Sequence, residues 1–398
     1  PKAKGLKKWF IPQAALFVGL MPFTFFWFHQ APLWSPLSNF FAIPMMSFAV
    51  VPVVLLAAFL SWLPFLQVLL LKGSVLILKG LWIPLEWMSH WPMSEMILYA
   101  SAYELILMSM AVAGLFLFKD TPSRLLCLFG FLPLWFHPNG ISEGGLDLHV
   151  LDVGQGTAIV VQTQHHTLLF DFGPQYASFD AGSQIILPFL NYHHIHTIDK
   201  AVLSHSDMDH RGGLLSVLEK KKVQELITSN PSAIKPKSIP CLKGESFEWD
   251  GVRFEFLHPG HILPKKTNNQ SCVLKISNES VSILLPGDIE QKIEQTLLNH
   301  PSLKADLIVV PHHGSLSSSS EAFIKAVDPK YAIVPVGYKN RYGFPKDPVV
   351  KRYENQGAQL LKTDEEGAIS ISISKSSIKK ICSWRKEENG IWLQNEDN

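Results

Sequence analysis

Cysteine is scarce in this sequence, and the cysteines present lack the spacing of a metal-binding motif. No C-x-x-C pair occurs in the 398 residues, and four scattered positions hold all the cysteine: Cys127, Cys241, Cys272 and Cys382. This spacing indicates neither a zinc knuckle nor a disulfide framework. We therefore interpret all four cysteines as packing residues.

Net charge is also nearly absent, at +1 with histidine neutral. Bulk electrostatics therefore gives no argument for a nucleic-acid or acidic partner, and only local clusters of charge could provide one. Charged residues are sparse before about residue 137, whereas most of the histidine, aspartate and glycine turns come later. The two parts of the chain are suited to different solvents.

The first 137 residues contain apolar runs long enough to cross a bilayer, which takes roughly 20 residues. The candidate segments are 9–28, 39–62, 63–88, 96–118 and 125–136. Lys72, Lys79 and Glu86 interrupt the third, which could cross or lie in the interface. Glu104 in the fourth would be costly at mid-membrane unless paired or facing water, and a glutamate that snorkels to the interface or is protonated in a helix contact is an equal alternative. Pro44 and Pro52 predict a kinked second segment.

The basic residues indicate how the chain is oriented in the membrane. Lysines at the start of the chain precede an apolar run, which is one mark of a signal peptide, although the further runs favour the back part of a larger polytopic protein. If 63–88 crosses, the basic residues place the loop 119–124 in the cytoplasm and the following domain outside. If it lies on the surface, the orientation reverses. We expect a multi-pass protein of the inner (plasma) membrane with its later domain extracytoplasmic.

After residue 137 the pattern changes to short β-rich runs such as LDLHV, AIVVQT and DLIVV, separated by turns. Helical stretches are predicted at 214–222, 290–299 and 319–326. Many strands with intervening helices predict two sheets with helices outside. We expect a membrane segment at 1–137, a folded domain at 144–375 and a charged tail at 376–398, with the active site at strand ends.

The segment Ser204-His205-Ser206-Asp207-Met208-Asp209-His210 follows one of these predicted strands. Its two imidazoles and two carboxylates would be expensive to bury alone, whereas a divalent cation satisfies them together. The alternative is a solvated polar loop. The segment predicts a metal site if the chain turns sharply there.

Three further strands end in residues of the same chemical character. They present Asp171 in LLFDFG, Asp288 in LLPGD, and His312 with His313 in VVPHHGS. An acid after a strand is commonly a turn or helix cap when it stands alone. Taken together, the four strand ends predict a convergent set of metal ligands.

These motifs resemble those of a known family. The segment from His205 to His210 is similar to the H-x-H-x-D-H signature of the metallo-β-lactamase superfamily, with Asp207 where the second histidine usually stands. DVGQG, NNQS, LPGD, PHHGS and the apolar segment 36–52 resemble the ComEC-type competence proteins, which are DNA-uptake channels of bacterial transformation. The resemblance covers nearly the whole chain up to about Lys375.

The resemblance implies a polytopic α-helical membrane segment followed by an αββα sandwich with metal-dependent deoxyribonuclease activity on the strand that is not imported. It implies two divalent ions, one held by His205 and Asp207 and the other by Asp209 and His210. Asp288 would bridge them, and His313 or His312 would complete the shell. Oxygen-rich ligands favour Mn²⁺, with Zn²⁺ and Mg²⁺ as alternatives.

Roles in catalysis follow from two-metal chemistry, in which two cations activate a water and neutralise charge on a phosphate ester. Asp209 is predicted to orient the attacking water, and His312 or His313 to protonate the leaving oxygen. The family often has G-H-P where this chain has Gly343-Phe344-Pro345, so Phe344 puts full activity in doubt.

Several polar and aromatic residues are candidates for contact with DNA. Asn268, Asn269 and Ser271 could hydrogen-bond a phosphate or sugar, or form a turn. Tyr338 and Tyr342 could stack on bases, although packing is the favoured interpretation. Basic clusters in predicted loops and helix ends could hold phosphates or be plain solvated surface: Lys220, Lys221 and Lys222; Lys235 and Lys237; Lys265 and Lys266; Lys339 with Arg341.

Three functions remain open at this point. The leading one is DNA uptake, with single-stranded or unwinding duplex DNA, the lipid bilayer and other DNA-uptake proteins as partners. A membrane-tethered hydrolase of another ester is the second. The third is a translocation channel whose sandwich domain binds DNA without cutting it, which Phe344 favours and the retained acids and imidazoles oppose.

Overall fold

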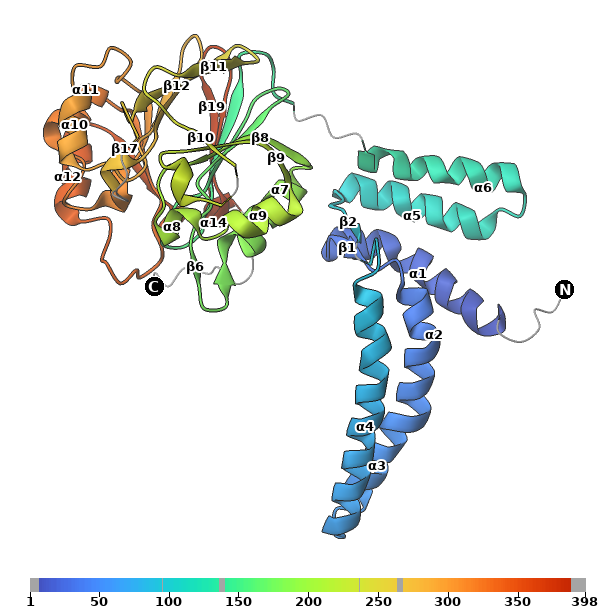
Figure 1. The fold of residues 1–398 in the computed structure, drawn as a ribbon. Coiled ribbons are helices and arrows are strands. Elements are labelled where there is room, and N and C mark those ends of the chain that lie inside the picture. Colours follow the sequence, from blue (N-terminus) through green and yellow to red (C-terminus); the bar gives the residue numbers. More distant parts are fainter. Residues whose placement is uncertain (1–6, 95, 136–139, 236, 263–267, 388–398) are drawn as a thin grey trace, which may run out of the picture. The chain divides into compact units, whose positions relative to one another are not determined.

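The computed structural model describes residues 7–94, 96–135, 140–235, 237–262 and 268–387. The chain divides into two compact units, Pro1–Pro138 and Asn139–Asn398. The first is built of helices and the second of two large sheets with helices (Figure 1).

Long apolar helices dominate the first unit. Its elements are α1 (Lys7–Trp27), β1 (Gln30–Ala31), α2 (Ser35–Met45), a π-helical turn (Met46–Val50), α3 (Val51–Phe59), α4 (Pro64–Ser89), β2 (Met96–Ile97), α5 (Ala102–Leu117), α6 (Thr121–Cys127) and a 3₁₀ segment (Leu128–Trp135). Ser35–Phe59 and Pro64–Ser89 are long and apolar enough to cross a membrane, judged by length and composition alone.

The surface of these helices suits an apolar solvent. Phe48, Phe59 and Phe65 are 75%, 76% and 83% exposed, which is unfavourable in water for aromatic side chains of this size. Pro44 and Pro52 flank the π-helical turn, which relieves the backbone bonds that the proline rings break. Where the sequence predicts a kink in the second apolar run, the structure has a one-turn change of helix type.

The segment 96–118 differs from the continuous span that its composition predicts. Its first residues form β2, and α5 begins only at Ala102. Glu104 lies in the first turn of α5, where its carboxylate accepts from the Ser101 backbone at 2.6 Å while the Ser101 hydroxyl accepts from the Glu104 backbone at 3.3 Å. This reciprocal pair is a capping box. The carboxylate therefore caps a helix end and does not sit in the middle of a span.

The second unit is a sandwich of two twisted sheets. The first sheet has the order β10-β9-β8-β5-β4-β3-β18-β19, with bounds β3 Leu146–Val150, β4 Ile159–Gln162, β5 Thr167–Phe170, β8 Thr197–Leu203, β9 Lys222–Thr228, β10 Ile239–Pro240, β18 Ile369–Ile373 and β19 Ile378–Ser383. The second runs β11-β12-β13-β14-β15-β16-β17, with bounds β11 Ser246–Trp249, β12 Val252–His258, β13 Val273–Ser277, β14 Ser282–Leu285, β15 Leu307–Val309, β16 Tyr331–Val334 and β17 Gln359–Lys362.

Three hydrophobic cores define four layers. The central core joins side chains of both sheets, such as Leu148 and Val202 from the first and Phe254 and Leu307 from the second. The other two cores lie between each sheet and its own helices. The first sheet is covered by α7 (Leu187–Tyr192) and α9 (Leu214–Lys220), and the second by α10 (Gln291–Leu297), α11 (Glu321–Val327) and α12 (Asp347–Asn355). This is the αββα sandwich that the sequence predicts.

The end of the domain lies further along the chain than residue 375, where the motif match stops. Strand β19 pairs antiparallel with β18, with Cys382 opposite Ser370, and α14 (Trp384–Glu387) follows it. The sequence predicts a charged tail at 376–398, but residues 378–387 of this range form an edge strand and a short helix. Residues 388–398 lie outside the described part of the chain.

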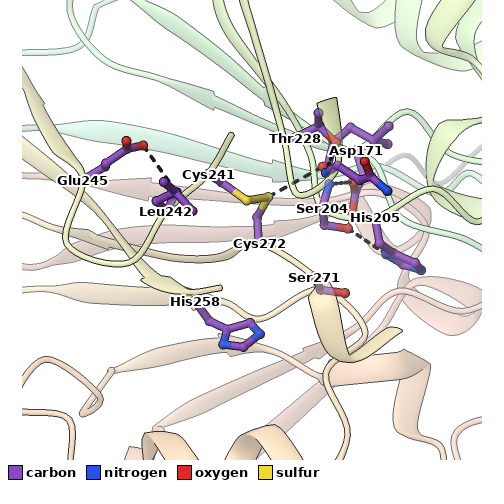
Figure 2. The surroundings of a disulfide bond; sticks show 12 residues. Asp171, Ser204, His205, Thr228, Cys241, Leu242, Glu245, His258, Ser271 and Cys272 are labelled. Carbon is purple, nitrogen blue, oxygen red and sulfur yellow. Dashed lines mark hydrogen bonds between the residues drawn. A yellow bond between two sulfur atoms is a disulfide. The ribbon is translucent and has the colours of Figure 1, made fainter. Parts of the chain in front are cut away.

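Two cysteines are bonded, which corrects their interpretation as packing residues. Cys241 and Cys272 form a disulfide across 31 positions of the sequence, while Cys127 and Cys382 are free. Cys241 follows β10 of the first sheet and Cys272 precedes β13 of the second. The bond therefore ties the two sheets together, and Figure 2 shows it close to Ser204, His205 and Ser271. Sequence spacing could not reveal this pair because only folding brings it together.

Candidate metal centre

The ends of parallel strands from both sheets meet at one edge of the sandwich. In the first sheet β5 and β8 are parallel, and in the second β14, β15 and β16 are parallel. The residues after these strands carry the predicted ligands: Asp171 follows β5, the His205–His210 segment follows β8, Asp288 follows β14, and His312 and His313 follow β15. Residues that are distant in sequence are thereby gathered at the strand ends.

The segment after β8 turns sharply, as the sequence requires. Asp207 is extended and immediately precedes α8 (Met208–Arg211), and the His210 amide donates to the Asp207 carbonyl at 3.1 Å. This single turn of helix places Asp209 and His210 in the cluster while Asp207 stays 52% exposed. The alternative of a solvated polar loop is excluded by the burial of His205 and His210.

The cluster has a tight centre and a second group beside it. One donor atom each from Asp209, His210, Asp288 and His313 lies within 4.8 Å of all the others. The Nε2 atom of His210 is 3.2 Å from Asp288, and that of His313 is 3.5 Å from Asp209. Beside this group, the Nε2 atom of His205 lies 3.7 Å from Asp207 and 3.8 Å from Asp288. Asp288 therefore touches both groups.

Buried hydrogen bonds fix the protonated nitrogen of His205 and His210. The carboxylate of Asp171 accepts from His210 Nδ1 at 2.7 Å and from the Ser204 hydroxyl at 2.8 Å. Since the Ser204 proton is used in this way, its oxygen accepts from His205 Nδ1 at 3.0 Å. Asp171 thus orients two imidazoles and is not itself one of the clustered ligands, which refines the role that its strand end suggested. Nothing in the sequence motif indicated that Ser204 would orient His205.

His313 is fixed in the same sense, and His312 differently. His313 Nδ1 donates to the Pro335 carbonyl at 2.7 Å. The Nε2 atom of His312 accepts from the Asn268 amide at 3.3 Å and lies 4.0 Å from Asp288, with 21% of its side chain exposed. Both histidines have positive φ, 51° and 53°, a backbone conformation that non-glycine residues adopt at a cost. The structure therefore selects His313 for the buried cluster and leaves His312 at its rim.

The donor set fits divalent cations. Among the described residues, the Nε2 atoms of His205, His210 and His313 are buried without a hydrogen-bond partner, although carboxylate oxygens lie nearby. In the neutral ring, Nε2 carries the lone pair because Nδ1 holds the proton. Three such lone pairs facing carboxylates are costly to bury unless a cation accepts them. Imidazole nitrogen with carboxylate oxygen suits Mn²⁺, Zn²⁺ and related divalent ions.

The charges within the cluster are strongly coupled. Burial, together with the neighbouring His210, lowers the pKa of His205 to about 4, so this imidazole is neutral at pH 7. Burial opposes a charge on His210, but Asp288 and Asp171 outweigh it and raise its pKa, so a cation bound at Nε2 takes the place of a second ring proton. Burial would raise the pKa of Asp288, yet His210 and His313 hold it well below its usual range. The site therefore holds ionised carboxylates, the form that binds cations.

The DVGQG motif supports the backbone beneath Asp209. Gly156 has a φ of 152°, and a β-carbon there would collide with the Asp209 carbonyl. That carbonyl accepts from the Thr157 amide at 3.1 Å. The glycine is needed because the two backbone segments are in direct contact, which gives this part of the motif a positioning role.

Two of the three polar residues expected at the substrate bind the protein itself. Asn269 donates to Glu290 Oε2 at 2.8 Å and accepts from the Glu290 amide at 3.0 Å. Ser271 is buried, and its hydroxyl accepts from the Asp288 amide at 3.1 Å. These contacts form the turn that presents Asp288, as the alternative interpretation held. Asn268 alone remains at the rim, through its contact with His312.

The lysines predicted beside the site lie elsewhere. Lys222 begins β9 opposite Thr197, the first residue of β8, whereas the cluster follows the last residue of β8. Seven residues of strand separate the two ends by roughly 20 Å. The Lys221 ammonium donates to the Ile195 carbonyl, and Lys220 ends α9. The structure thus separates Lys220 and Lys221 from the metal centre, a correction to their predicted place. Lys265 and Lys266 lie outside the described residues.

Comparison with known proteins agrees with this architecture. Residues 2–123 match the family model described as Competence protein, and residues 151–338 match that of the Metallo-beta-lactamase superfamily. The uncharacterized protein YcaI of Escherichia coli is 32% identical over 94% of this chain and 49% of its own length. Competence protein ComA of Neisseria gonorrhoeae is 32% identical over 88% of this chain and 50% of its own length.

A solved structure of the metallo-beta-lactamase fold protein YhfI from Bacillus subtilis is 13% identical, covers 57% of this chain and 99% of its own, and has a TM-score of 0.41. The chain spans about half the length of the curated relatives it matches. A competence-protein region followed in one chain by a metallo-β-lactamase domain, together with relatives named Competence protein ComA and, in Bacillus subtilis, ComE operon protein 3, shows that this chain belongs to the ComEC-type family of competence proteins.

Proposed function

We propose that this chain acts in DNA uptake as a membrane protein whose sandwich domain hydrolyses phosphodiester bonds of DNA with the help of two divalent cations. The observation that carries the proposal is the set of three buried imidazoles whose Nε2 lone pairs face Asp209 and Asp288. The competence relatives support DNA as the substrate. The strand that is not imported is the proposed target of hydrolysis.

Each ligand group would hold one ion. His205 and Asp207 would bind the first, Asp209, His210 and His313 the second, and Asp288 contacts both groups. The set combines three carboxylates with three imidazoles, a mixture that suits Mn²⁺, with Zn²⁺ and Mg²⁺ as alternatives. Bound cations would supply an activated water and neutralise charge on the phosphate.

Two side chains at the rim of the cluster take the remaining catalytic roles, the orientation of the attacking water and the protonation of the leaving oxygen. The carboxylate of Asp209 is 36% exposed and lines a cavity beside the cluster, so it can orient the attacking water by accepting a hydrogen bond from it. His312 is half-buried and free of the buried cluster, held by Ser317 on one nitrogen and Asn268 on the other. Because its Nε2 accepts from Asn268, His312 carries its proton on Nδ1, and this is the proton that it would give to the leaving oxygen.

The disulfide supports a location for the sandwich domain. Disulfides form and persist in oxidising compartments and are rare in the cytosol. The Cys241–Cys272 bond is buried beside the metal centre and is consistent with folding outside the cytoplasm. We place the domain on the extracytoplasmic side of the inner membrane. In spheroplasts, added protease should cleave the domain without lysis, and full protection until lysis would place it inside.

A binding role without cleavage is the second candidate, and Phe344 favours it. The ring of Phe344 lies 6.1 Å from that of His312 and stacks on Tyr342 at 5.5 Å. It fills the rim of the cluster where related sequences often have a histidine. A proton donor could be missing there, which would lower the rate of hydrolysis without disturbing the binding of metal or DNA.

One experiment separates the two functions. The full chain in detergent is titrated with Mn²⁺ by calorimetry and assayed for cleavage of a labelled oligonucleotide, beside Asp209→Ala. We expect metal binding and cleavage by the native chain, and a loss of cleavage of at least about 100-fold in the variant. Metal binding without cleavage by the native chain would establish the second candidate. Undiminished cleavage by Asp209→Ala would refute the role of that residue.

A further inference from the structure

A second feature adjoins the metal centre, a cavity of about 660 Å³ that opens beside Asp209. Its size falls in the range of about 300–1,000 Å³ that is usual for small-ligand sites. Three tyrosines on two separate segments contribute to its wall: Tyr176 in the hairpin of β6 (Gln175–Tyr176) and β7 (Phe179–Asp180), and Tyr338 and Tyr342 in the loop after β16. None of these residues belongs to the ligand set.

The loop that carries two of these tyrosines is rigidly held. The Asn340 amide donates to the carbonyls of Gly337 at 3.1 Å and Phe344 at 2.7 Å, and its oxygen accepts from the Phe344 amide at 3.0 Å. At its start, Gly337 packs so closely that a β-carbon would come within 2.7 Å of the Gln155 nitrogen. The loop therefore does not have to be ordered at the moment of binding, which lowers the entropic cost.

The aromatic rings are exposed, contrary to the packing role favoured for Tyr338, whereas Tyr342 also stacks on Phe344. Tyr338 is 66% exposed, Tyr342 45% and Tyr176 58%. Cations lie over the two loop rings, with Lys339 Nζ 5.0 Å from the Tyr338 centroid and the Arg341 guanidinium 4.8 Å from that of Tyr342. Exposed rings beside exposed cations are the usual means by which proteins hold unpaired bases and their phosphates.

We propose that this cavity binds an unpaired nucleobase, stacked on Tyr338 beside Tyr342, and that it thereby sets the adjoining phosphodiester at the metal centre. The inference rests on the proposed function in that both concern the same substrate, a single-stranded nucleic acid. A paired base keeps its faces stacked within the duplex and cannot enter. A duplex end must fray before it is held, so the cavity selects single strands.

The test compares the binding of a strand that carries bases with the binding of a strand that has only the sugar-phosphate backbone. The full chain in detergent, with EDTA to prevent cleavage, is titrated by fluorescence anisotropy with a labelled thymidine oligonucleotide and with an abasic strand of equal length. The variants are Tyr338→Ala/Tyr342→Ala and Tyr338→Phe/Tyr342→Phe, with Tyr192→Ala as a control for an exposed tyrosine outside the cavity.

We expect the native chain to bind the base-containing strand about tenfold or more tighter than the abasic one. The alanine pair should lose this preference and keep its affinity for the abasic strand, while the phenylalanine pair and Tyr192→Ala should retain both. Equal binding of the two strands by the native chain, or an intact preference in the alanine pair, would overturn the inference.

The same chain is assayed separately for cleavage with Mn²⁺. Base preference without cleavage would defeat the proposed nuclease alone, and cleavage without base preference would defeat the cavity alone.

Discussion

The helical unit and the sandwich use their side chains in opposite ways. In the helices, hydrogen bonds such as Thr24 to Met21 and Ser74 to Leu71 reach back three residues, and large apolar side chains face outward. In the sandwich, the apolar side chains fill three cores. Its functional hydrogen bonds join residues far apart, such as His210 and Asp171, which are separated by 39 positions.

This difference predicts which substitutions each unit will tolerate. A helix in an apolar solvent satisfies its backbone within its own segment, so the loss of one local contact is felt locally. The metal centre depends on four strand ends and a disulfide that come from both sheets. We therefore expect large effects from changes at its supporting contacts and small effects from changes at helix ends.

The disulfide should give the largest effect on stability. Replacing both cysteines, Cys241→Ala/Cys272→Ala, frees a loop of 31 residues and should cost about 2–4 kcal/mol. Hydrogen exchange of the full chain, read at β10 and β13, measures the change. Cys382→Ala, a half-buried free cysteine, is the matched control. Equal protection in the native chain and the double variant would show that the bond does not hold the sheets together.

Replacing Asp171 should have the next largest effect, a loss of metal affinity, because Asp171 orients two imidazoles without joining the cluster. Asp171→Asn preserves its volume but replaces an acceptor oxygen with a donor, which leaves His210 Nδ1 or Ser204 poorly matched. Removal of such an outer contact typically weakens metal binding about 10–100-fold. Calorimetry with Mn²⁺ on the full chain measures the loss. An unchanged affinity together with an unchanged fold would mean that the ligands hold their orientation unaided.

A pair of glycines tests the close approach beneath Asp209. Both Gly156 and Gly244 have positive φ, but a β-carbon at Gly156 would strike the Asp209 carbonyl, whereas Gly244 has open space around it. Gly156→Ala should displace Asp209 and lower cleavage about tenfold. Gly244→Ala also places an alanine at a positive φ but without the collision, so it should cleave nearly normally. Similar rates for both variants would assign the effect to strain alone.

The smallest expected effect lies in the helical unit. Ser101→Ala removes the capping box at the start of α5 and should cost about 1 kcal/mol, confined to the first turn of the helix. Hydrogen exchange at Leu105 and its neighbours should increase, while the sandwich stays protected. A change in protection at β8 or β14 would contradict the contrast drawn between the two units.

Much of the site could be predicted from the sequence because its ligands stand directly after strands. Each of Asp288, His313 and the His205–His210 segment follows an apolar run that marks a strand, and parallel strands present their ends at a common edge. The lysine cluster was misplaced because a helix and a strand have two ends, and the sequence does not say which end faces the site. The capping role of Glu104 was missed because composition alone cannot locate where a helix begins.

The sequence by itself determined two sheets with helices outside, the apolar helices and the type of ligand, since periodicity and chemistry are local properties of the chain, while the αββα order was implied by the family resemblance. Only the tertiary structure decided that Cys241 meets Cys272, that Asp171 stands behind the imidazoles, and that Asn269 and Ser271 serve the turn at Asp288. These outcomes depend on distances between segments remote in sequence. Such distances are fixed by how two sheets pack, which no single segment specifies.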